Sequence, residues 1–295
     1  RITHLNLREN DVHWQFDDDD LKALIGKCGL LTHLDLGFNS NTSKLGVQTL
    51  IAHCPSLTSL DLQSHRMGAA HAASLMELTA TCVHLTDLNL SNNDIDADGV
   101  HGIAHAVAAC SSLRRLDLSH NSLGYRGLSV LAPALAELSH LQLLNLHNTA
   151  APFDAATLLV ALLLPASLDP PDPSSSSSLF EPSASSPGAR ASLTALDLSG
   201  NDMTSAEVAE LSALLLLRTS SCSLRRLCLG PPDASSSDPD PDSDRSLPRS
   251  AAHSLKRPRP GLALAATFVT QRPLCALELR YCGLGREGAG VLGKV

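Results

Sequence analysis

A short phrase of alternating apolar and polar residues recurs nine times along the chain. The phrases begin at Ile2, Leu31, Leu57, Leu85, Leu113, Leu141, Leu193, Leu224 and Leu274. In each phrase the first, fourth and sixth positions are apolar, and all of them are Leu except Ile2. Such alternation predicts a short strand that buries its Leu side chains on one face. Most phrases follow one another after roughly 28 residues, which is the length of one structural repeat.

The stretch between two phrases has the periodicity of a helix. Apolar residues recur there at steps of three and four, which predicts an amphipathic helix. The clearest runs are Val100, Ile103, Ala104 and Val107, and then Leu128, Leu131, Ala132 and Leu135. Gly99, Gly127 and Gly288 are expected directly before such helices. One strand and one helix per repeat predict an α/β solenoid shaped as a horseshoe, with a parallel inner sheet and outer helices.

The ninth position of each phrase is also restricted in type. Asn fills it in five repeats, and a buried Asn can hydrogen-bond to the backbone of its own turn and of the neighbouring repeat. The Asn residues are Asn10, Asn39, Asn93, Asn121 and Asn201, and the departures are His65, Thr149, Pro232 and Cys282.

LxxLxLxxN, followed by LGxxG and an Ala- and Leu-rich helix that ends in Cys, resembles the ribonuclease-inhibitor class of leucine-rich repeats. That class includes ribonuclease inhibitors, Ran GTPase-activating proteins and the sensing portions of NOD-like receptors. The resemblance implies the solenoid fold and points to binding of another protein rather than to catalysis.

Two low-complexity stretches interrupt the repeats. We expect repeats 1 to 6 in residues 1–164, a disordered Ser/Pro-rich insert at 165–192, repeat 7 and the strand of repeat 8 at 193–229, a second disordered insert at 230–260, and the helix of repeat 8 with a truncated repeat 9 at 261–295. The pattern already runs at Arg1 and still runs at Val295, so further residues are expected at both ends.

The composition limits which classes of partner are expected. The chain has 22 basic and 30 acidic residues and a net charge of -8, and the basic residues are scattered, so a nucleic-acid ligand is not expected. No apolar run approaches the roughly 20 residues of a membrane span. A protein partner, basic in character, suits this balance.

The cysteines favour a reducing compartment. Cys28, Cys54, Cys82 and Cys110 each lie three residues before a phrase, so they represent one repeat position, where a small thiol closes the helix against the core. This interpretation outweighs a disulfide or a metal site, and it favours the cytoplasm, with the nucleus as the alternative.

Other candidate chemistry has a simpler explanation in each case. His101 and His105 stand four apart on a helix but lack an accompanying Glu, so a solvent-facing pair is favoured over a metal site. The carboxylates of 17–20 precede the expected helix 21–28 and suit its N-terminus. The basic stretch 254–260 resembles a nuclear import signal, although such stretches are common in disordered loops. No nucleophile motif or nucleotide-binding loop occurs, so no catalytic residue, cofactor or metal is assigned.

The leading functional hypothesis is a protein-interaction scaffold. With the Leu residues inward, the third, fifth and seventh positions face the concave surface, and the fifth position is a line of carboxylates and amides. The candidate partner-binding residues are Asp35, Asp61, Asn89, Asp117, Asn145 and Asp197. This line would attract a basic partner, although Asp could also be simply a tolerated residue at a wet position.

Two further functions remain open. The first is a GTPase activator resembling the Ran GTPase-activating protein, which would engage a small GTPase. The second is an inhibitor or sensor of the ribonuclease-inhibitor or NOD-like receptor kind. The inhibitor is disfavoured because Trp and Tyr dominate tight interfaces, and none of Trp14, Tyr125 and Tyr281 lies at a strand position that faces the concave surface.

Overall fold

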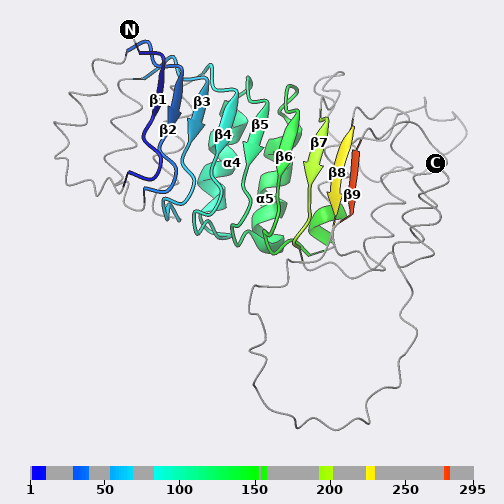
Figure 1. Ribbon diagram of the computed structural model, residues 1–295. Helices are drawn as coiled ribbons and strands as arrows, with labels where there is room; N and C mark the ends of the chain where they lie inside the picture. Colours follow the sequence, from blue (N-terminus) through cyan, green and yellow to red (C-terminus); the bar gives the residue numbers. More distant parts are fainter. Residues whose placement is uncertain are drawn as a thin grey trace, which may run out of the picture.

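Nine parallel strands form one sheet in this computed structural model, in the same order as along the chain (Figure 1). The structure describes residues 2–10, 29–39, 54–68, 83–152, 154–157, 193–201, 224–229 and 276–279. The strands are β1 (His4–Asn6), β2 (His33–Asp35), β3 (Ser59–Asp61), β4 (Asp87–Asn89), β5 (Arg115–Asp117), β6 (Leu143–Asn145), β7 (Ala195–Asp197), β8 (Arg226–Leu229) and β9 (Ala276–Leu279). The predicted parallel sheet of a solenoid is confirmed.

Equivalent positions of the phrase are neighbours across the sheet. The fourth-position residues Leu34 and Leu60 pair between β2 and β3, and Leu60 pairs in turn with Leu88 of β4. The same register holds from β1 to β9. A column of the aligned sequence is therefore a row of adjacent side chains in space.

The Leu positions build the core, as the alternation predicts. Leu57, Leu60 and Leu62 of the third phrase are all at most 1% exposed. The first phrase differs, because β1 lies at the edge of the sheet: Ile2 is 54% exposed and Leu5 is only partly buried. A repeat of this kind buries its apolar side chains only between two neighbours.

Within the described ranges, two complete helices, α4 (Val100–Ala109) and α5 (Gly124–Ala136), pack side by side against one face of the sheet (Figure 1). Both were predicted from their apolar periodicity. Gly99 directly precedes α4 as expected, but the placement of Gly127 before a helix is wrong, because it lies inside α5. A Cβ atom on Gly127 would lie 3.2 Å from Leu123 Cβ and 3.5 Å from Val100 Cγ1, so this position is restricted by helix packing.

The ninth position joins each repeat to the one before it. The Asn121 amide Nδ2 donates to the carbonyl oxygens of Leu90 and Leu118, both at 2.9 Å, while its Oδ1 accepts the backbone N–H groups of Asn93 and Ile95. Asn39, Asn93 and Asn201 are likewise buried and donate to the backbone in the same way. Asn10 is exposed, in keeping with its place at the edge of the sheet.

The two departures at this position within the described ranges keep part of the same hydrogen bonding. His65 Nε2 lies 2.7 Å from the Leu36 carbonyl oxygen, so an Nε2–H tautomer donates to the preceding repeat. Thr149 Oγ1 donates to the carbonyl oxygen of Leu146 in its own repeat at 3.0 Å. Both side chains are buried.

Cys54 and Cys110 are buried against the core, as the repeat position predicts. Several other expectations fall outside the described residues: Cys28, Cys82, the acidic run 17–20, Trp14, Tyr281, Gly288, Pro232, Cys282, the basic stretch 254–260 and the two inserts.

Candidate interaction surface

The sheet face opposite α4 and α5 is here called the open face, and it carries the third, fifth and seventh positions of each phrase. The fourth and sixth positions point the other way, into the core, as the burial of Leu60 and Leu62 shows. Strand side chains alternate between faces, so the positions between them belong to the open face. No helix that the structure describes covers this face (Figure 1).

The fifth position forms a continuous row of carboxylates and amides across β1 to β7, called here the acid–amide row. Its members are Asn6, Asp35, Asp61, Asn89, Asp117, Asn145 and Asp197, neighbours in the strand register. Asn6 is exposed and the others are half-buried. The structure therefore brings together all six candidate residues of the sequence analysis.

Each member of the row has a structural role that the sequence analysis did not predict. Asp61 Oδ1 accepts the backbone N–H of Gln63 at 2.8 Å, and Asn89 Oδ1 accepts that of Ser91 at 3.0 Å. The same contact, from the side chain to the N–H two residues on, recurs at every other member of the row. It explains why Asp and Asn share the position, because both place an acceptor oxygen at this distance from the backbone.

Amides separate some of the carboxylates. Asn89 Nδ2 donates to Asp61 Oδ2 at 2.9 Å, and Asn145 Nδ2 donates to Asp117 Oδ2 at 2.8 Å. Each of these two carboxylates thus has both oxygens engaged, one by the backbone and one by the amide of the next strand. The row ends at β8, where Cys228 takes the fifth position and is buried.

Arg8 compensates the charge at the start of the row. Its Nη1 lies 3.5 Å from Asp61 Oδ2 and 3.9 Å from Asp35 Oδ1, and its Nη2 donates to Gln63 Oε1 at 2.9 Å. The guanidinium Cζ also lies 4.5 Å from the centroid of the Phe38 ring, which is a cation–π contact. One cation therefore spans the ends of β1, β2 and β3.

Burial is the main influence on the ionisation of Asp61. It raises the pKa of this carboxyl above 3.8, and the nearby charge of Asp35 adds to the effect. The hydrogen bonds from Gln63 and Asn89 and the charge of Arg8 act in the opposite direction, without cancelling the rise in pKa. The Arg8 guanidinium, not the shift in pKa, is what offsets part of the negative charge at β2 and β3.

Asp117 and Asp197 keep their negative charge uncompensated. Neither carboxylate has a Lys, Arg or His nitrogen within 4.0 Å among the residues that the structure places. Their local partners are Ser119 and Ser199, whose hydroxyls each donate to Oδ1 at 2.6 Å. Among the described members of the acid–amide row, the carboxylates without a basic neighbour therefore lie between β5 and β7.

A His, a Ser and an Asp meet at β7 without forming a hydrolytic triad. His147 Nδ1 lies 2.9 Å from Ser199 Oγ, but this hydroxyl donates to Asp197 and is buried. A catalytic Ser would instead donate to His and face the substrate. Ser119 and Asp117 make the same contact two repeats earlier, so it belongs to the repeat.

The third position also lies on the open face, but its residue type changes from strand to strand. His4 and His33 stack at β1 and β2 with ring centroids 4.1 Å apart. Arg115 Nη1 pairs with Asp87 Oδ1 at 2.7 Å between β4 and β5. Leu143 and Ala195 follow at β6 and β7, both half-buried, and Arg226 at β8 is exposed. The strand alternation that gave the fifth position would have given this one too.

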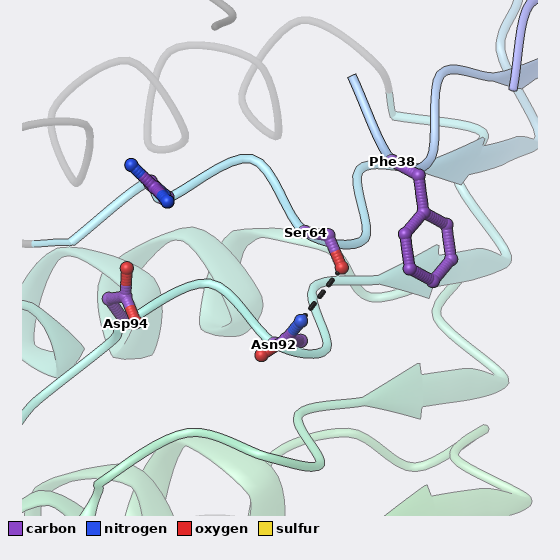
Figure 2. Close-up of a pocket in the computed structure, with 5 residues that line it drawn as sticks. Phe38, Ser64, Asn92 and Asp94 are labelled. Carbon is purple, nitrogen blue, oxygen red and sulfur yellow. Dashed lines mark hydrogen bonds between the residues drawn. The ribbon is translucent and has the colours of Figure 1, made fainter. Parts of the chain in front are cut away.

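A pocket of about 530 Å³ opens beyond the ends of β2 to β4 (Figure 2). It is lined by Phe38, Ser64, Arg66, Asn92 and Asp94. Asn92 Nδ2 donates to Ser64 Oγ at 2.9 Å, and Figure 2 shows this contact between the Phe38 ring and the Asp94 carboxylate. The lining combines both charges with one aromatic ring, so it favours no single ligand.

Other candidates lie away from the open face. His101 and His105 are exposed on α4, which agrees with the solvent-facing interpretation, and Tyr125 is exposed on α5. Over the described ranges, no group of three or more His, Cys, Asp or Glu side chains could hold a metal ion. No helix within those ranges has both the length and the apolar character needed to cross a bilayer.

This repeating strand–helix unit, with an Asn joining successive turns, defines a leucine-rich repeat solenoid. A family model described as Leucine Rich repeat matches residues 53–73, 81–104, 109–132 and 191–206. The matched segments are leucine-rich repeats, and the nine-stranded parallel sheet has the arrangement of a leucine-rich repeat solenoid, with repeats that resemble the ribonuclease-inhibitor-like type.

Solved structures also match the chain. The leucine-rich repeat-containing protein LegL7 from Legionella pneumophila is 20% identical over 77% of this chain, with a TM-score of 0.48, and the match spans 65% of that protein. The C-terminal domain of tropomodulin from Caenorhabditis elegans is 16% identical over 50% of this chain and 90% of its own, with a TM-score of 0.40. No curated protein matches the sequence.

Proposed function

We propose that this protein is an interaction scaffold that binds a basic protein partner on the open face of its sheet. The observation that carries the proposal is the acid–amide row, which crosses β1 to β7 on a face that α4 and α5 leave uncovered. The proposed contact residues are Asp35, Asp61, Asn89, Asp117, Asn145 and Asp197. An extended sheet face of this kind offers a partner many contacts without requiring a pocket.

The charge distribution indicates where the attraction is strongest. Arg8 offsets Asp35 and Asp61, whereas Asp117 and Asp197 have no such counterion among the described residues. A basic partner would gain most by placing its cations over β5 to β7 and leaving Arg8 in place. Uncompensated charge of this kind mainly speeds the first encounter and makes it sensitive to salt.

The proposed working compartment is the cytoplasm. Buried thiols such as Cys54 and Cys110 persist best where reducing conditions prevail. The GTPase-activating alternative stays a prediction from resemblance, because no contact or charge of the described repeats bears on it.

The test is a kinetic one. A partner is captured with the intact chain, identified, and its association rate measured against salt for Asp197→Asn and for Asp117→Asn/Asp197→Asn. Asn already fills this position at β4 and β6, so the contact to the backbone is retained. We expect the double variant to associate about 3- to 10-fold more slowly at low salt, with a flatter salt dependence.

The matched control carries the same loss of charge on the helical side. Asp98 precedes α4 and Glu137 follows α5, and both are exposed. Asp98→Asn/Glu137→Gln should leave the association rate and its salt dependence unchanged. Binding that responds to the control pair and not to the open-face pair would place the partner on the helices and overturn the proposal.

A further inference from the structure

A second charged zone lies at the beginning of the strands, where Arg115 and Arg226 occupy the third position on the open face and Arg114 and Arg225 occupy the second position, just before it. Arg115 and Arg226 are the first residues of β5 and β8, and Arg114 and Arg225 directly precede them; all four are exposed. The sequence gives these pairs no special place, because positions two and three of the phrase carry Thr, His, Ser and other residues in the remaining repeats.

One of these arginines forms an ion pair within the protein, and two have no carboxylate neighbour among the described residues. Arg115 is paired with Asp87 at 2.7 Å, and its side chain remains 65% exposed. Arg114 and Arg225 have no carboxylate within 4.0 Å in the part of the chain that the structure places. One uncompensated guanidinium therefore stands at each end of the zone.

The space between the arginine pairs is apolar. The register aligns Arg115 with Leu143, Leu143 with Ala195, and Ala195 with Arg226. Leu143 and Ala195 are half-buried, so each presents part of its surface to the open face. The two third-position arginines are three strand intervals apart, roughly 14 Å at about 4.8 Å per interval. The third position of β5 to β8 is therefore a short apolar surface, Leu143 and Ala195, with an arginine on each side.

We propose that this zone binds an extended, acidic segment of a partner protein that runs across β5 to β8. An extended chain advances roughly 3.4 Å per residue, so side chains four residues apart on one face are about 14 Å apart. A segment with carboxylates at its first and fifth residues places one at each arginine pair. The side chain of its third residue then lies on Leu143 and Ala195, so an apolar residue fits there. The expected pattern is acid-x-apolar-x-acid.

The acid–amide row limits where such a segment can lie. Asp117, Asn145 and Asp197 are two residues further along the same strands, roughly 7 Å away. Carboxylates are therefore attracted to the beginning of the strands and repelled from the fifth position. This opposition fixes the line on which the segment crosses, and it separates this zone from the one proposed for a basic partner.

The experiment is a selection of random heptapeptides, displayed on phage, against the intact chain. We expect enrichment of two acidic residues four apart with an apolar residue midway. A synthetic peptide of the enriched sequence should bind Arg114→Gln/Arg225→Gln at least about tenfold more weakly than the unchanged protein. Arg114→Glu/Arg225→Glu should instead select basic residues at the two ends.

Arg126→Gln is the matched control, because Arg126 is exposed on α5. It should bind the peptide as the unchanged protein does. Selection of no peptide, of basic peptides, or of peptides that bind the double Gln variant equally well would overturn the proposal. Self-association that disappears in the double variant would also overturn it, by assigning the zone to a second copy of the chain. Asp117 and Asp197 are untouched in these variants, so the two proposals can fail independently.

Discussion

At the scale of single residues, the polar side chains that recur in each repeat also form hydrogen bonds that hold the backbone in place. Asn121 makes hydrogen bonds to the backbone of two repeats, and Asp61 accepts the N–H of Gln63 just after its own strand. His65 and Thr149 show which part of this role can be replaced. The requirement at the ninth position is a buried donor for the turn, rather than an amide as such.

Replacing Asn121 by Ala should lower the free energy of unfolding by about 2 to 4 kcal/mol, because several buried backbone groups lose their partners at once. Asn121→Thr should cost less, since Thr149 fills the same position in the next repeat. Denaturant unfolding measures both values, with Ser122→Ala at an exposed neighbouring position as the control. An Ala variant as stable as the control would show that water replaces the Asn.

The ionisation of Asp61 gives a second prediction at this scale. Since burial raises its pKa in the folded state above 3.8, protonation favours folding. This contribution to stability is fully present below pH 3.8 and is lost as the pH rises through the folded pKa. Removing the Arg8 charge by Arg8→Gln should raise the pKa of Asp61 further.

An NMR titration of the Asp61 carboxyl carbon measures both values directly. Glu9→Gln serves as the control, because Glu9 contacts Arg8 from the exposed side. A midpoint below 3.8 in the unchanged protein, or a downward shift in Arg8→Gln, would contradict the account of this carboxylate.

At the scale of strands and helices, the sequence predicts most of what the structure shows. The Leu alternation fixes which face of each strand is buried, and the apolar periodicity locates α4 and α5. The position of Gly127 could not be obtained in this way, because it depends on how closely α5 approaches Ala97 and Val100. Likewise, the reach of Arg8 over two strands depends on a side-chain conformation that no periodicity encodes.

Gly127→Ala should destabilise the protein although Ala favours helices. The added Cβ would lie 3.2 Å from Leu123 Cβ, which is fixed to the backbone and has little freedom to move. Overpacking costs about 1 to 3 kcal/mol, and the better helix propensity of Ala returns at most about 1 kcal/mol. Thermal unfolding compared with Ser129→Ala in the same helix measures the difference; a stabilised Gly127→Ala would show that α5 shifts freely.

The thiol at the end of α4 gives a further prediction. Cys110 is 1% exposed, and a Ser hydroxyl costs more to bury than a thiol, so Cys110→Ser should destabilise by about 1 to 3 kcal/mol. Ser111→Ala, at the exposed next residue, should have little effect. Equal stability of the two variants in denaturant unfolding would contradict a role for the thiol in the core.

At the scale of the whole molecule, the open face of the sheet carries both positive and negative side chains. The arginine pairs stand at the beginning of β5 and β8, and the carboxylates of Asp117 and Asp197 lie at the fifth position of β5 and β7. The members of the acid–amide row can be predicted from the strand alternation alone. Their net charge cannot, since the pairing of Arg8 with Asp35 and Asp61 becomes visible only in three dimensions.

The central claim is that partners bind the open face, and site-specific photo-crosslinking tests it most directly. A photoreactive residue replaces Asn145, in the middle of the acid–amide row, and in a second protein it replaces Ala108, which is exposed on α4. The account predicts that the captured partner is crosslinked from position 145 and not from position 108. Crosslinking from position 108 alone would show that the helical side is the binding surface and would contradict the claim.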